Sequence, residues 1–184
     1  AMDDIREAAR LRPDDAEVQL GFSRILLINS LTNQALTAAR KARELEPDSA
    51  RVVAHIAEIY LGLRAWVESE EMARLALERD PHNARARWIL AEVYGRTARL
   101  DEALAVLDTP DLDRLRLKER ELLTEATSRW TTRRQTLANL EKEAQGDEAS
   151  PADLLALAEA LVQSGQREQS LALVERALAE GSVA

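Results

Sequence analysis

Apolar side chains recur along this chain at helical rather than strand spacing. Amphipathic runs end at Pro13, Pro47 and Pro81, whereas Val, Ile and Thr never form the alternating runs that are typical of strands. Proline ends a helix because it forces the residue before it out of the α region. The pattern therefore predicts an all-α chain built from short amphipathic helices.

The three prolines are evenly spaced. Pro47 follows Pro13 by 34 residues, and Pro81 follows Pro47 by the same interval. A fixed period of this length is typical of repeat arrays. We therefore predict a single array over residues 1–184. Its parts are a half repeat at 1–15, repeats at 16–49, 50–83 and 84–116, a degenerate repeat at 117–150 and a further repeat at 151–184.

Small and bulky residues recur with the same period. Counted from the start of repeats 16–49 and 50–83, position 7 holds Phe22 and Ile56, position 8 holds Ser23 and Ala57, position 11 holds Leu26 and Tyr60, position 20 holds Ala35 and Ser69, position 24 holds Ala39 and Ala73, and position 27 holds Ala42 and Ala76. This pattern, with proline at position 32, resembles the tetratricopeptide repeat. The resemblance implies a right-handed α-solenoid of helix-turn-helix repeats. Small residues where helices cross would let the helix axes approach to about 8–10 Å.

The repeats beyond residue 84 follow the pattern less closely. In repeat 84–116 a proline falls within the expected second helix, so we expect that helix to be short and the link through Pro110–Asp111 to be irregular. Repeat 151–184 is more regular, and we predict Ser150 as the cap of its first helix and Pro151 at the first helical position.

Residues 117–150 are the hardest to assign. In the repeat frame Leu123 falls at position 7 and Leu140 at position 24. We interpret the stretch as a degenerate helix pair with a turn near Trp130–Thr132. The alternative is one long helix, or a hinge between two halves of the solenoid.

Neither end of the array carries an obvious polar capping helix, which terminal repeats usually need. We therefore expect the sequence to be a segment of a longer array; a reading frame that starts at Met2 and stops at Ala184 would contradict this. Uncapped end repeats also make self-association possible.

Composition narrows the function. Apolar residues make up 46% of the chain but aromatic residues only 3%, so the core must consist mainly of Ala and Leu. The net charge of −8 argues against a nucleic-acid partner, which would require a basic footprint. The absence of cysteine excludes disulfides and thiol chemistry, and no apolar run is long enough for direct membrane insertion. Arginine greatly outnumbers lysine and alanine is abundant, which indicates a bacterial source. We expect a soluble protein and leave its compartment, bacterial cytoplasm or periplasm, open.

Motifs that carry catalysis are missing. No Gly-rich phosphate loop, Gly-x-Ser-x-Gly elbow or His-Glu-x-x-His motif occurs. Of the two histidines, His82 is expected in a surface turn. His55 lies on the first helix of repeat 50–83, without a second histidine at metal spacing. We therefore predict no enzyme activity, no metal and no cofactor.

The resemblance also implies a binding surface. In tetratricopeptide domains the first helices of the repeats line a concave groove, and here they would present Arg24, Arg51, His55, Glu58, Arg85, Trp88, Glu92 and Arg96. Arginine recurs at position 2 and glutamate at position 9, which lie on one helical face. This predicts a cationic row beside an anionic row, suited to a mixed-charge peptide with an apolar anchor near Trp88. The alternative is that these charges pair between neighbouring repeats, which contributes little to stability when the pairs are exposed.

The function that follows is a non-catalytic scaffold that binds a protein or peptide partner in the groove. We expect it to belong to a larger bacterial protein or assembly, for example envelope or exopolysaccharide export machinery. The alternatives are a regulatory domain attached to an enzyme in the same polypeptide, and a self-association module. Only Arg85 approximates the residues with which a subclass of these repeats clamps the C-terminal carboxylate of chaperones.

Overall fold

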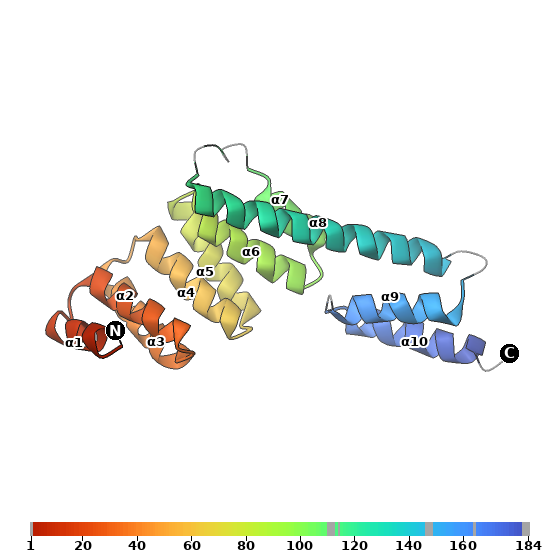
Figure 1. Ribbon diagram of the computed structural model, residues 1–184, viewed down its shortest axis with the longest axis horizontal. Coiled ribbons are helices and arrows are strands. Elements are labelled where there is room, and N and C mark those ends of the chain that lie inside the picture. The colour runs from red at the N-terminus through yellow and green to blue at the C-terminus, as the bar shows by residue number, and fades with distance from the viewer. Residues whose placement is uncertain (1, 110–112, 114, 146–148, 164, 182–184) are drawn as a thin grey trace.

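The structure is a computed structural model, and it describes residues 2–109, 113, 115–145, 149–163 and 165–181. Within these residues the chain forms ten helices and no strand, arranged as an elongated array (Figure 1). The helices are α1 (Met2–Leu11), α2 (Ala16–Ile28), α3 (Thr32–Leu45), α4 (Ala50–Gly62), α5 (Trp66–Arg79), α6 (Ala84–Arg96), α7 (Leu100–Leu107), α8 (Leu117–Gln145), α9 (Pro151–Gln163) and α10 (Arg167–Gly181). The predicted all-α solenoid is confirmed. No helix of the described part is both long and apolar enough to span a bilayer.

Helices α2 to α7 form three successive hairpins, and small side chains lie where the two helices of each hairpin cross. In the first hairpin Ser23 Oγ donates a 2.7 Å hydrogen bond to the carbonyl of Ala35, and in the second Ser69 Oγ donates one of 2.9 Å to the carbonyl of Ala57. All four residues are completely buried. The small residues at repeat positions 8 and 20 therefore allow close packing, and each buried hydroxyl is satisfied.

Every hairpin turn contains one residue in the left-handed region. These residues are Ser30 (φ 61°), Arg64 (φ 58°), Ala98 (φ 65°) and Gly165 (φ 86°). The residue that follows each of them donates its N–H to the carbonyl five positions earlier, as in the bond from Leu31 to Leu26 at 2.9 Å. This is the hydrogen bond of a Schellman motif, which ends a helix and reverses the chain.

Helix α8 departs from the hairpin pattern. It runs without interruption for 29 residues, so the predicted turn near Trp130–Thr132 is wrong, and the alternative of one long helix holds. Thr132 lies 34 residues after Ala98, where the repeat would require a left-handed residue. A β-branched side chain strongly disfavours that conformation. Trp130 is also buried against Gly95 of α6, which keeps this part of α8 on the surface of the preceding hairpin.

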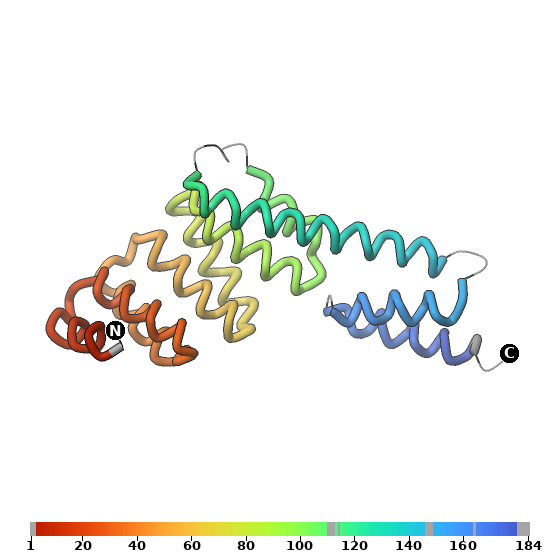
Figure 2. Tube along the Cα trace, viewed as in Figure 1, coloured from red at the N-terminus to blue at the C-terminus, as the bar shows by residue number. Residues whose placement is uncertain are grey.

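Helix α9 packs against the second half of α8, and α10 packs against α9. Figure 2 shows α9 running back along α8 and α10 running outward again. The three helices share a core that includes Leu137, Leu154, Leu157, Leu161 and Ala177. Helix α9 begins as predicted: Pro151 is its first residue, and Ser150 Oγ accepts a 3.3 Å hydrogen bond from the N–H of Asp153.

Helix α7 has only 8 residues, which agrees with the short helix that the early proline predicted. The irregular link predicted through Pro110–Asp111 lies outside the described residues.

Candidate functional site

A cavity of about 650 Å³ opens on the face formed by the first helices of the repeats. Its walls come from the second half of α2, most of α4, the turn before α6 and the first turns of α8. Leu27, Ile28, Ala54 and Leu122 supply its apolar lining, and Ile28 is 81% exposed. We call this cavity the groove.

Five of the predicted binding residues line the groove, namely Arg24, Arg51, His55, Glu58 and Arg85. Trp88, Glu92 and Arg96 do not belong to its lining. The structure thus brings together the predicted residues of α2 and α4 and the first predicted residue of α6. Trp88 lies beside Arg85 but outside the lining, and Glu92 and Arg96 lie apart from it.

The position of α8 explains why Glu92 lies apart from the groove. Glu92 is only 1% exposed, because Arg129 of α8 covers it and donates a 2.7 Å hydrogen bond to its carboxylate. Arg96 donates two more hydrogen bonds to the same carboxylate, at 3.1 and 3.3 Å. The anionic row expected at position 9 therefore ends at Glu58, and Glu92 serves the contact between α6 and α8.

Trp88 packs half-buried against the core around α6. The guanidinium carbon of Arg85 lies 4.9 Å from the centre of its ring, a cation–π distance. This contact holds the Arg85 side chain beside the tryptophan.

Two arginines of the groove form ion pairs with glutamates of the preceding repeat. Arg85 Nε donates a 3.1 Å hydrogen bond to Glu58 Oε2, and Arg51 pairs with Glu17 on α2. Burial alone would raise the pKa of Glu58, but its interactions with Arg85 and with the nearby His55 ring outweigh this effect and hold the pKa below the ordinary 4.5. The stabilisation from this carboxylate is therefore present above its unfolded pKa and is lost as the pH falls through the lower folded value.

His55 is fixed within the wall of the groove and is only 4% exposed. Its Nε2 lies 2.9 Å from Ser23 Oγ, and its Nδ1 lies 3.7 Å from Glu58 Oε2. Because the Ser23 hydroxyl already donates its proton to the carbonyl of Ala35, it must accept from His55, which places a proton on Nε2. His55 thus connects α2 with α4 and shapes the wall of the groove.

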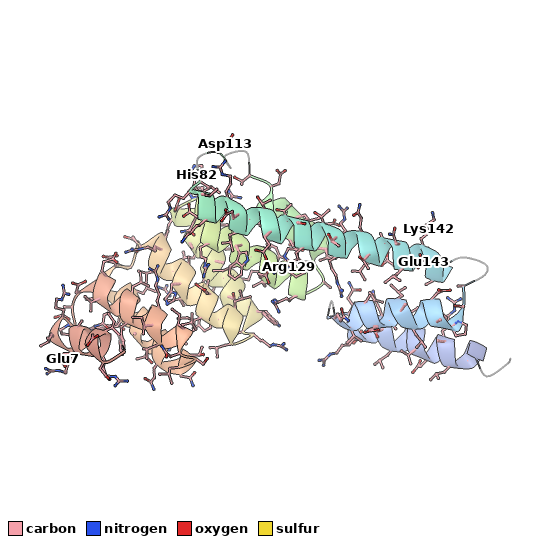
Figure 3. The ribbon with its side chains drawn as sticks, viewed as in Figure 1. Glu7, His82, Asp113, Arg129, Lys142 and Glu143 are labelled. Atoms are coloured by element: carbon pink, nitrogen blue, oxygen red, sulfur yellow. The ribbon has the colours of Figure 1, made fainter. Side chains whose placement is uncertain are left out.

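Several residues that line the groove escaped the sequence analysis. They are Asp80, His82 and Asn83 in the turn before α6, and Arg116, Lys118, Glu119 and Leu122 around the start of α8; Figure 3 shows His82 near that start. One signal was available: in the frame that begins at 117, Lys118 occupies position 2, as Arg51 and Arg85 do in theirs. Within the described residues, no three metal-ligating side chains gather in a cluster.

Solved structures with a similar architecture decide the fold family. The YrrB protein, described as a TPR protein with an unusual peptide-binding site, is 18% identical, with 97% of this chain and 92% of that chain covered and a TM-score of 0.54. TTC0263, a thermophilic TPR protein of Thermus thermophilus, is 21% identical, with 90% and 91% covered and a TM-score of 0.54. The chain has the tetratricopeptide-repeat fold. PilF of Pseudomonas aeruginosa is similar as well, at 22% identity, 96% and 78% coverage and a TM-score of 0.57.

No family model matches the chain, and no curated protein matches it in sequence. At identities of 18 to 22%, the three solved structures establish a common tetratricopeptide-repeat fold and leave the ligand to be argued from the groove itself.

Proposed function

We propose that the chain is a non-catalytic scaffold that binds a peptide segment of a partner protein in the groove. The observation that carries this proposal is the cavity itself. It has a volume of about 650 Å³, lies on the face where repeat solenoids bind partners, and exposes 81% of the apolar side chain of Ile28. An isoleucine exposed at a cavity is suited to pack against an apolar side chain of a ligand.

The test uses peptides selected by the protein itself. A random 12-residue peptide display library is panned on the immobilised chain, and affinities of the enriched peptides are measured by fluorescence anisotropy. We expect Ile28→Asp to weaken binding by about tenfold or more, because it places an unpaired charge against the apolar part of the ligand. The matched control is Val67→Asp on α5, since Val67 is 76% exposed and does not line the groove.

The proposal fails if the two substitutions weaken binding equally, or if neither has an effect while circular dichroism shows both variants folded. A loss confined to Ile28→Asp supports it.

The setting of the scaffold stays a prediction from the sequence. A place in bacterial envelope or exopolysaccharide export machinery predicts that partners of that machinery co-purify with the chain in stoichiometric amounts. A regulatory domain predicts an enzyme encoded in the same polypeptide.

Self-association is a second candidate function, and the outer face of α10 favours it. Leu171 and Leu178 on this face are 62% and 68% exposed. The residues at the same repeat positions upstream, Leu104 and Leu77, pack against the core. Two exposed leucines on one face of a helix are a candidate interface for a second copy.

Sedimentation velocity over a hundredfold range of concentration tests this candidate. Self-association predicts a shift towards a dimer that Leu171→Lys combined with Leu178→Lys abolishes. A single monomeric species at all concentrations contradicts it.

A further inference from the structure

The carboxylates that line the groove all have partners within the protein. Glu58 and Glu119 are each bonded to an arginine that also lines the groove. Asp80 accepts a 3.0 Å hydrogen bond from the N–H of His82 and so closes the turn before α6. The negative charges of the groove are therefore already engaged in interactions inside the chain.

The cations of the groove are not balanced in the same way. Arg24 and Lys118 line the groove and are exposed, and neither side chain makes a hydrogen bond or ion pair within the described residues. Arg51 does have a partner, but that partner is Glu17, which lies outside the groove lining. Positive charge is thus concentrated at the groove of a chain whose net charge is −8.

The positions of these residues give the groove a direction. Arg24 belongs to the second half of α2, whereas Lys118 belongs to the first turn of α8. Between them lie the middle of α4 and the first turn of α6, so the groove crosses the stacked helices obliquely. Ile28 lies one helical turn from Arg24 on the same face of α2, so an apolar contact and a cationic contact lie side by side.

We infer that the groove takes an acidic peptide segment, with carboxylates that reach Arg24 and Lys118 and an aliphatic side chain that packs against Ile28. This inference rests on the proposed function and names the chemistry of the ligand. It replaces the mixed-charge ligand expected from the sequence, because Glu58 and Glu92 are occupied by arginines of the chain itself. Complementary charge would also speed association and set the orientation of the peptide.

The test is the charge of the peptides that the chain selects. The same 12-residue random library is panned on three proteins: the wild type, Arg24→Glu combined with Lys118→Glu, and the control Lys142→Glu combined with Arg167→Glu. The control changes the net charge equally at two exposed residues that do not line the groove. We expect the wild type and the control to enrich peptides that are more acidic than the library and contain an aliphatic residue. Those peptides should bind the variant with Arg24→Glu and Lys118→Glu, which we call the groove variant, at least about tenfold more weakly than they bind the wild type.

Salt provides a second measurement. Affinity of the wild type for the selected peptides should fall as NaCl rises from about 50 to 500 mM, and the groove variant should lose most of this dependence. Arg24→Gln combined with Lys118→Gln keeps the test valid if the reversed charges disturb the fold.

The outcomes separate the inference from the function it rests on. Enriched peptides that match the library in charge or are basic, yet lose affinity with Ile28→Asp, overturn the acidic ligand and leave the groove as the binding site. A lack of any enriched peptide sensitive to Ile28→Asp overturns both.

Discussion

Helices α2 to α7 and helices α8 to α10 show two outcomes of nearly the same sequence pattern. In the first region three hairpins turn at Ser30, Arg64 and Ala98, each in the left-handed conformation and each 34 residues from the next. In the second region the corresponding residue is Thr132, and α8 runs straight through it. The comparison teaches that the repeat needs one residue able to adopt positive φ, in addition to its apolar pattern.

The consequence extends beyond one turn. Because α8 does not reverse, its second half extends past α6 and α7. Helix α9 packs against that extension, and α10 packs against α9 (Figure 2). The first turns of the same helix form one wall of the groove. A single uninterrupted helix therefore connects the terminal three-helix unit with the groove.

Breaking α8 at the missing turn should have the largest effect. Thr132→Pro removes a hydrogen bond of the helix and places the proline ring against the preceding turn, which costs about 3 kcal/mol or more. We expect α9, α10 and the second half of α8 to unfold at lower urea concentration than α2 to α7, measured by hydrogen exchange. Thr132→Ala is the control. It should leave the urea concentration at which this region unfolds unchanged or raise it slightly, since alanine favours helix. A single concerted transition in the proline variant would contradict the separation into two units.

The contact between α6 and α8 should be next in size. A Cβ added at Gly95 would lie 2.5 Å from the Trp130 ring, so Gly95→Ala should lower the free energy of unfolding by about 1–3 kcal/mol. Gly62→Ala is the matched control: it adds the same methyl group in a helix with nothing within 4 Å, and should stabilise by about 0.5–1 kcal/mol.

A double-mutant cycle measures the coupling between Gly95 and Trp130. Urea denaturation is compared for the wild type, Gly95→Ala, Trp130→Leu and the variant that carries both substitutions. Removal of the indole should restore part of the stability lost in Gly95→Ala. Equal losses with and without Trp130 would show that this contact does not hold α8 in place.

The turns themselves should give the smallest effects, with opposite signs. Gly165→Ala puts a side chain at φ 86° and 3.1 Å from the carbonyl oxygen of Arg96, so we expect a loss of about 1–2 kcal/mol. Arg64→Gly relieves the same strain at φ 58° and should gain a few tenths of a kcal/mol. Thermal denaturation measures both changes, and a gain from Gly165→Ala would refute the role assigned to the left-handed turn residue.

Part of the candidate site was predictable, and the reason is local. The position of a residue within its repeat determines whether it lies on the first helix and which face of that helix it occupies. This information was enough to predict that Arg24, Arg51 and Glu58 lie on the groove face, and all three line the groove. The same reasoning misplaced Glu92, because its surroundings depend on Arg129, 37 residues away. Lys118 was missed because its stretch fits the repeat poorly.

The sequence by itself determined the helix pairs outside residues 117–150, the 34-residue period and the caps around Ser150 and Pro151. These depend on apolar spacing and on the backbone limits of proline and small residues. Only the tertiary structure decided that α8 is continuous, that Glu92 is buried, and that Arg24 and Lys118 line the groove with no ion-pair partner among the described residues. Each of these depends on which side chains of distant segments meet. Packing of Trp130 on Gly95 and pairing of Arg129 with Glu92 are contacts that no local pattern encodes.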